Sequence, residues 1–131
     1  IENCLLFHDK INILVSAALF HTTGLQLGAR GVIGSPLEYF GNPNRIFEFE
    51  SMSEDERRDL MRLSLEIKQV NSYLGTVPAA YKAGLNMIGL PAGYTRDPIK
   101  PLTADDEAKL RAFLVKWGAP VTDAAPIRAA E

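Results

Sequence analysis

Two short apolar runs flank a helical stretch in the first third of the chain. The runs are residues 11–15 (INILV) and residues 31–34 (GVIG), and the helical stretch covers residues 17–28. Short apolar runs rich in β-branched residues are typical of buried strands. Because the strand–helix–strand unit is so compact, it predicts a parallel crossover connection.

A long amphipathic helix is predicted after a loop at residues 36–43. Asn42 is placed to cap a first helical segment with Pro43 at its first position. Ser53 and Glu56 then have the spacing of a capping box. Apolar residues recur behind this pair at intervals of three and four for about six turns, which predicts one buried face. These residues are Leu60, Leu63, Ile67, Val70 and Leu74.

Two further helices are predicted toward the end of the chain. Gly75 ends the long helix, and Pro78 begins another that stops before Gly89. The proline- and glycine-rich residues 91–102 predict an extended segment. Thr103 is then placed to cap a last helix, whose acidic first turn suits the positive end of the helix dipole.

That last helix presents an apolar stripe and ends at Gly118. The stripe consists of Leu110, Phe113, Leu114 and Trp117. Beyond it, the Ala- and Pro-rich residues 119–131 predict a frayed tail. We therefore divide the chain into strand–helix units at 1–50, a helical layer at 51–118 and a tail at 119–131. Two parallel strands do not form a stable sheet alone, so the sequence predicts part of a larger fold.

The order and spacing of several motifs resemble the dihydrodipicolinate synthase and N-acetylneuraminate lyase family. They are residues 27–35 (LGARGVIGS), 83–93 (AGLNMIGLPAG), 96–98 (RDP) and 101–103 (PLT). The resemblance covers residues 1–118 and implies an α/β fold, the C-terminal part of a TIM (β/α)8 barrel. The last two strands of the barrel would be followed by a helical extension. It also implies a class I aldolase or lyase, in which a lysine amine condenses with pyruvate to a Schiff base.

By this resemblance, the substrate site lies where the two strands end. Ile33 would belong to the wall that holds pyruvate, next to Gly34, and Ser35 would meet the acceptor end of the substrate. Ser16 stands where the family usually has glycine. The acidic pair that usually follows it is replaced by the apolar residues 17–19 (AAL). Loss of these carboxylates predicts a less polar acceptor. Glu38 stands where the family usually has an asparagine, and this departure also argues against the family's usual substrates.

The family's Schiff-base lysine and its tyrosine partner would lie before Ile1, so the resemblance assigns no catalytic residue to this chain. Lys10 precedes the first predicted strand, at the end of a barrel where active sites are not built. The remaining lysines fall on the helical layer and the segments around it: Lys68, Lys82, Lys100, Lys109 and Lys116. The resemblance implies pyruvate and an aldehyde as partners, the missing N-terminal half of the barrel, a homo-oligomer (dimer or tetramer) and no metal or organic cofactor.

Composition narrows the remaining possibilities. The formal charge of −2 offers no basic excess for nucleic acid. No apolar run approaches the roughly 20 residues of a membrane span, and there is no signal-peptide pattern, which together predict a cytoplasmic protein without membrane contact. Cys4 is expected to be a packing residue. His8 and His21 lack a third ligand at metal-like spacing, and His21 is expected to be partly exposed.

Two other functions remain open on the sequence alone. The chain could be a non-catalytic helical association module or a half-barrel module that pairs with another chain or with itself. The Tyr39-Phe40 pair could reach over the pocket mouth or pack against the helices. A strand ending in Gly-x-Lys about ten residues before Ile1 would favour the enzyme.

Overall fold

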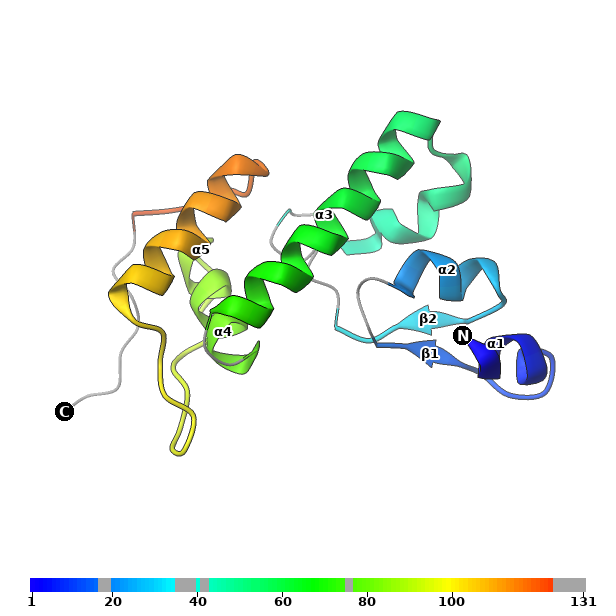
Figure 1. Ribbon diagram of the computed structural model, residues 1–131, viewed down its shortest axis with the longest axis horizontal. Helices are drawn as coiled ribbons and strands as arrows, with labels where there is room; N and C mark the ends of the chain where they lie inside the picture. Colours follow the sequence, from blue (N-terminus) through cyan, green and yellow to red (C-terminus); the bar gives the residue numbers. More distant parts are fainter. Residues whose placement is uncertain (17–19, 35–39, 41–42, 75–76, 124–131) are drawn as a thin grey trace. The chain divides into compact units, whose positions relative to one another are not determined.

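The computed structural model describes residues 1–16, 20–34, 40, 43–74 and 77–123 (Figure 1). In chain order its elements are α1 (Glu2–Phe7), β1 (Leu14–Val15), α2 (His21–Gln26), β2 (Gly31–Val32), the 3-10 helix η3 (Pro43–Ser51), α3 (Glu54–Tyr73), α4 (Val77–Met87) and α5 (Ala104–Lys116). Backbone contacts separate the chain into two compact units. The first holds Ile1–Glu38 and Asn42–Lys68, and the second holds Tyr39–Gly41 and Gln69–Glu131.

The first unit contains the predicted parallel strand pair. Leu14 pairs with Gly31 and Val15 with Val32. Helix α2 connects the strands and packs on β1 at Gly24, where an added Cβ would overlap the Val15 side chain. The parallel crossover is confirmed, but both strands are shorter than the apolar runs that predicted them.

The segment η3 is a 3-10 helix, although the sequence predicted only a helix start at Pro43. Ile46 and Phe49 of this helix are buried, and so is Met52 directly after it. They are spaced by three residues, which is the repeat of a 3-10 helix, so this winding keeps all three on one side. Helix α2 packs against this segment.

Helix α3 begins with the predicted capping box. The Ser53 backbone N–H donates to Glu56 Oε2 at 2.9 Å, and the Glu56 backbone N–H donates to Ser53 Oγ at 3.3 Å. The predicted stripe is buried at Leu60, Leu63, Ile67 and Leu74, with Ile67 only 1% exposed. The capping box and four of the five stripe positions are therefore confirmed, and Val70 is partly exposed instead of buried.

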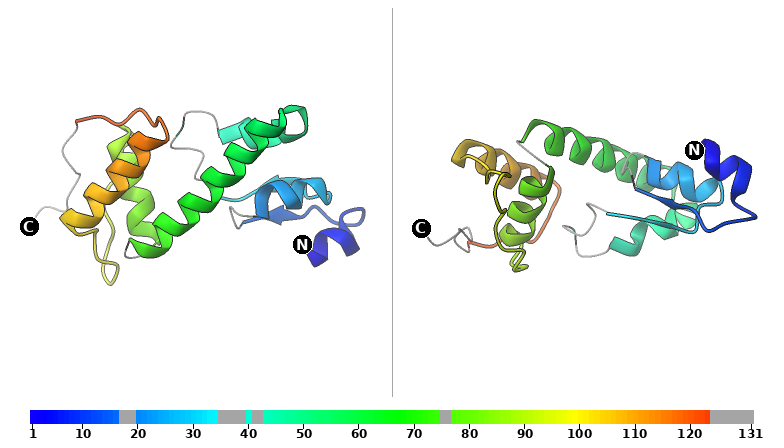
Figure 2. Two further views of the ribbon diagram at one scale, coloured as in Figure 1. Left: turned by 45° about the horizontal axis from the view of Figure 1, so that its top comes forward. Right: turned by 90° about the horizontal axis from the view of Figure 1, so that it is seen from below.

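In the second unit, α4 and α5 pack together, which is visible in two orientations (Figure 2). Gly89 ends α4 with a left-handed φ of +84°, and the Leu90 N–H donates to the Leu85 carbonyl at 2.9 Å. Thr103 caps α5 by accepting from the Asp106 N–H. Helix α5 buries three residues of its predicted stripe: Leu110, Phe113 and Leu114.

The residues directly after α5 correct the prediction of a frayed tail. The Thr122 N–H donates to the Met87 carbonyl at 2.7 Å, and Arg111 Nη1 donates to the Thr122 carbonyl at 3.0 Å. The sequence gives no hint of these bonds because they join residues far apart in the chain. Residues 119–123 are thus tied to both helices, and residues 124–131 lie outside the described part.

Candidate functional site

The carboxyl ends of β1 and β2 bring together three of the four predicted substrate-binding residues. Because the strands are parallel and in register, Ser16 and Ile33 follow at the same end, and the Ile33 N–H donates to the Val15 carbonyl at 2.8 Å. Gly34 comes next, with a φ of +69° and open space around the position of a Cβ. Ser35 lies outside the described residues, so its placement stays a prediction.

This end of the sheet is accessible. Ile33 is 55% exposed, and Ser16 and Gly34 are exposed as well. An apolar side chain beside a serine and an open glycine can form the wall of a small-molecule pocket once other elements close around it. The predicted departures from the family at residues 17–19 and at Glu38 lie outside the described residues, as does Tyr39. Phe40 is partly exposed.

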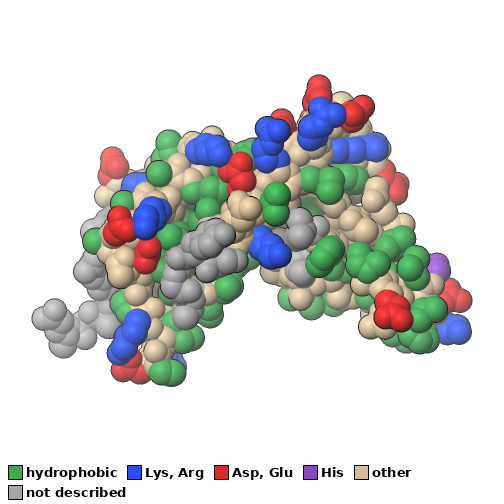
Figure 3. Space-filling model, in the orientation of Figure 1, with side chains coloured by type: hydrophobic (Ala, Val, Ile, Leu, Met, Phe, Trp, Pro, Cys, Tyr) green, Lys and Arg blue, Asp and Glu red, His purple; other side chains and the backbone are tan. Residues whose placement is uncertain are grey.

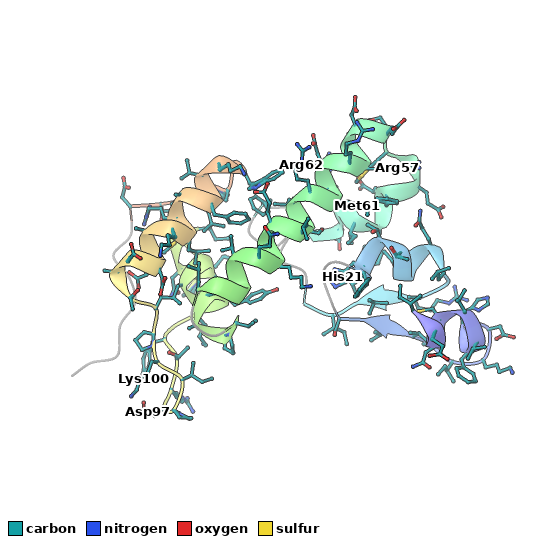
Figure 4. All side chains as sticks on the ribbon, viewed as in Figure 1. His21, Arg57, Met61, Arg62, Asp97 and Lys100 are labelled. Carbon is teal, nitrogen blue, oxygen red and sulfur yellow. The ribbon has the colours of Figure 1, made fainter. Side chains whose placement is uncertain are left out.

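His21 of α2 lies next to Ser16 at the carboxyl end of β1. The sequence prediction of its exposure was wrong. It is 1% exposed instead of partly exposed. The reason is the packing of α2 on β1: His21 and Gly24 are three residues apart, so they share the face of α2 that packs on the strands. Figure 4 shows His21 where α2 adjoins the strands. The signal that could have revealed this burial is the glycine one turn later.

The surroundings of His21 shift the pKa of its imidazole. Burial lowers its pKa below the ordinary 6.5, and a hydrogen bond to the Ser16 backbone opposes that shift in part. Its Nε2 is buried without a hydrogen-bond partner among the described residues. His21 therefore connects α2 to the residue at the end of β1, and sequence reasoning missed this contact.

Other candidate groups lie elsewhere. Lys10 is exposed before β1, at the opposite end of the strand from Ser16. Cys4 is buried in α1, as expected for a packing residue. Within residues 1–16, 20–34, 40, 43–74 and 77–123, no three His, Cys, Asp or Glu side chains lie together as a metal site would require. No helix in this part of the chain is long and apolar enough to span a bilayer.

Comparisons with known proteins agree with the resemblance. The model of the "Dihydrodipicolinate synthetase family" matches residues 3–116. The 4-hydroxy-tetrahydrodipicolinate synthase 1 of Halalkalibacterium halodurans is 29% identical over 87 residues, which are 66% of this chain and 30% of that protein. A crystal structure of a provisionally named dihydrodipicolinate synthetase from Pseudomonas aeruginosa superposes with a TM-score of 0.69 at 18% identity.

That superposition covers 88% of this chain and 40% of the solved one. The chain therefore shares its fold with part of that protein, and it spans less than half the length of either relative. Because the family match extends over most of the sequence, the chain belongs to the dihydrodipicolinate synthetase family.

Proposed function

We propose that this chain is the C-terminal part of a pyruvate-dependent lyase or aldolase that acts through a lysine Schiff base. The lysine lies outside residues 1–131. Family membership supports the reaction class, and the fold shared with part of a longer relative supports the partial span. In this chemistry the amine replaces the carbonyl oxygen of pyruvate, which leaves as water. The protonated imine loses a proton from the methyl carbon, and the resulting enamine attacks the carbonyl carbon of the aldehyde to form the carbon–carbon bond. In the reverse direction, the imine of the adduct accepts the electron pair released when that bond breaks.

The exposed sheet is the single observation that most favours a barrel completed by other elements. Parallel sheets normally have several strands and are covered on both faces. Among the described residues, however, β1 pairs only with β2. Leu14 is 54% exposed on β1, and Ile11 and Ile33 are 58% and 55% exposed just outside the strands. Figure 3 shows hydrophobic side chains gathered on the surface around these elements. Further strands would cover these residues and complete the pocket at the carboxyl ends.

Within that pocket, the residues of this chain would bind and select substrate. Ile33 and Gly34 would line the pyruvate end, and Ser35 would meet the acceptor. Ser16, in place of glycine, would add a hydroxyl group at the end of β1. The apolar residues 17–19 remove the carboxylates that would bind hydroxyl or amino groups, so we propose a less polar aldehyde as the acceptor.

The remaining parts of the proposal concern assembly and location. The last two strands of the barrel are β1 and β2, and α3 to α5 form the helical layer on residues 51–118. The enzyme works in the cytoplasm as a homo-oligomer, a dimer or a tetramer, and takes pyruvate without a metal or organic cofactor.

The experiment compares two polypeptides in one assay. The first is the 131-residue chain, and the second is the product of the reading frame that contains it. Each is mixed with pyruvate and either a non-hydroxylated or a polyhydroxylated aldehyde, and loss of pyruvate is followed. We expect turnover only by the longer product, with the non-hydroxylated aldehyde preferred. A folded longer product that consumes no pyruvate would instead support the association or half-barrel module.

A further inference from the structure

The second unit contains a cavity that the proposed barrel site does not use. It has a volume of about 270 Å³ and is lined by α4, by residues 93–95 and 101–102, and by the start of α5. None of the lining residues that the structure describes belongs to the strand ends. This volume is just below the range of about 300–1,000 Å³ that is typical of sites for drug-sized ligands, so the cavity suits a small metabolite.

The cavity exists because α4 holds the extended segment in place through its side chains. Lys82 Nζ donates to the Ala92 carbonyl at 2.6 Å. The Asn86 amide makes two bonds to the same segment, donating to the Gly93 carbonyl at 2.8 Å and accepting from the Ala92 N–H at 2.9 Å. These bonds fix the wall of the cavity at the end of α4. Between these lining stretches, Asp97 and Lys100 are exposed and pair with each other (Figure 4).

Charged donors in the lining exceed charged acceptors. Among the described lining residues, Lys82 and Arg111 are cations and Glu107 is acidic. The Lys82 ammonium has three donor hydrogens and Arg111 has five, so the bonds to Ala92 and to Thr122 leave donors for a ligand. Guanidinium and ammonium groups are the donors that proteins use to bind carboxylates.

The Thr95 hydroxyl in the lining points to a ligand independently of the charges. Its Oγ1 is buried, with no hydrogen-bond partner in the described part of the chain. A buried hydroxyl without a partner is unfavourable, because it has lost its bonds to water. Rotation of the Thr95 side chain about χ1 toward the cavity would let a bound polar molecule satisfy it. The neighbouring Tyr94 also lines the cavity and is 48% exposed.

We propose that this cavity is a binding site for a small monocarboxylate that carries a hydroxyl group. The carboxylate binds the donors of Lys82 and Arg111, and Thr95 supplies a further hydrogen bond. Glu107 disfavours a second carboxylate on the ligand and accepts from its hydroxyl. The cavity shares no described residue with the strand ends, and this proposal does not depend on the Schiff-base chemistry.

The test is a titration of the ¹⁵N-labelled chain followed by two-dimensional NMR at constant ionic strength. Lactate is the probe, with uncharged lactamide and the dianion malonate as comparisons. We expect saturable shifts from lactate centred on the amides of Gly93, Thr95 and Arg111, and weaker or no binding of the other two. Absence of saturable shifts, or equal binding of lactamide, would overturn the proposal.

Three variants locate the site. Arg111→Met should weaken lactate binding at least about tenfold, because a charge-assisted bond is lost. The control Arg62→Met removes an exposed cation of α3, outside the lining, and should leave binding unchanged (Figure 4). Thr95→Val should weaken binding about threefold or more without lowering the melting temperature, since it removes an unpaired hydroxyl. Unchanged affinity in Thr95→Val would refute this assignment even if Arg111→Met does not fold.

Discussion

Shortening Leu63 to alanine is expected to lower the free energy of unfolding by about 2–4 kcal/mol. Leu63 lies on the buried face of α3 with 8% of its surface exposed. Burial of a whole leucine side chain contributes about 1.5–3 kcal/mol, and the cavity left by the missing atoms adds to the loss. Ile67→Ala is expected to cost about 2–4 kcal/mol as well, because Ile67 is 1% exposed.

Leu65 supplies the matched control, two positions away on the same helix. It is 42% exposed, so Leu65→Ala removes less buried surface and should cost about 1 kcal/mol or less. Helix propensity changes equally in both leucine variants and cancels in the comparison. The assay is urea unfolding followed by far-ultraviolet circular dichroism. Equal losses at Leu63 and Leu65 would mean that the buried stripe of α3 is assigned wrongly.

Three further outcomes test the first unit and the proposed pocket. Gly24→Ala should destabilise the chain by about 1–3 kcal/mol in the same assay, because the new methyl group overlaps Val15, and Val15→Ala should relieve part of that loss. The folded state holds a lowered pKa at His21, so stability should be highest above pH 6.5 and fall as the pH drops below it. A pH series of melting temperatures should lose this fall in His21→Leu but keep it in His8→Gln. In the longer polypeptide, Ser35→Ala should reduce kcat/KM for a hydroxylated acceptor about ten- to thirtyfold while borohydride trapping of pyruvate persists, and loss of trapping with unchanged acceptor choice would place Ser35 at the pyruvate end.

Local signals account for the parts of the fold that the sequence predicted well. The Ser53–Glu56 capping box and the Thr103 cap each involve residues three apart, so their hydrogen bonds can be inferred from spacing. The apolar stripes of α3 and α5 are periodic over several turns and leave little choice of buried face. Gly89 and Gly118 end helices with positive φ values, as glycines at such positions commonly do.

Non-local contacts account for what the sequence did not show. Ile11 and Asn12 were expected in the first strand, but a residue joins a ladder only where a partner strand lies beside it. The burial of His21 depends on how closely α2 approaches β1 at Gly24. The bonds of Thr122 to Met87 and to Arg111 join positions far apart in the chain. The cavity of the second unit also depends on non-local contacts, because its donors Lys82 and Arg111 come from two different helices.

Borohydride trapping with pyruvate tests the proposed function most directly. Reduction converts a lysine–pyruvate imine into a stable secondary amine, which peptide mass spectrometry assigns to one residue. We predict that the longer polypeptide gains one pyruvate equivalent on a lysine outside residues 1–131, and that the isolated 131-residue chain gains none. A stoichiometric gain on any of the six lysines of this chain would contradict the proposal: Lys10, Lys68, Lys82, Lys100, Lys109 or Lys116.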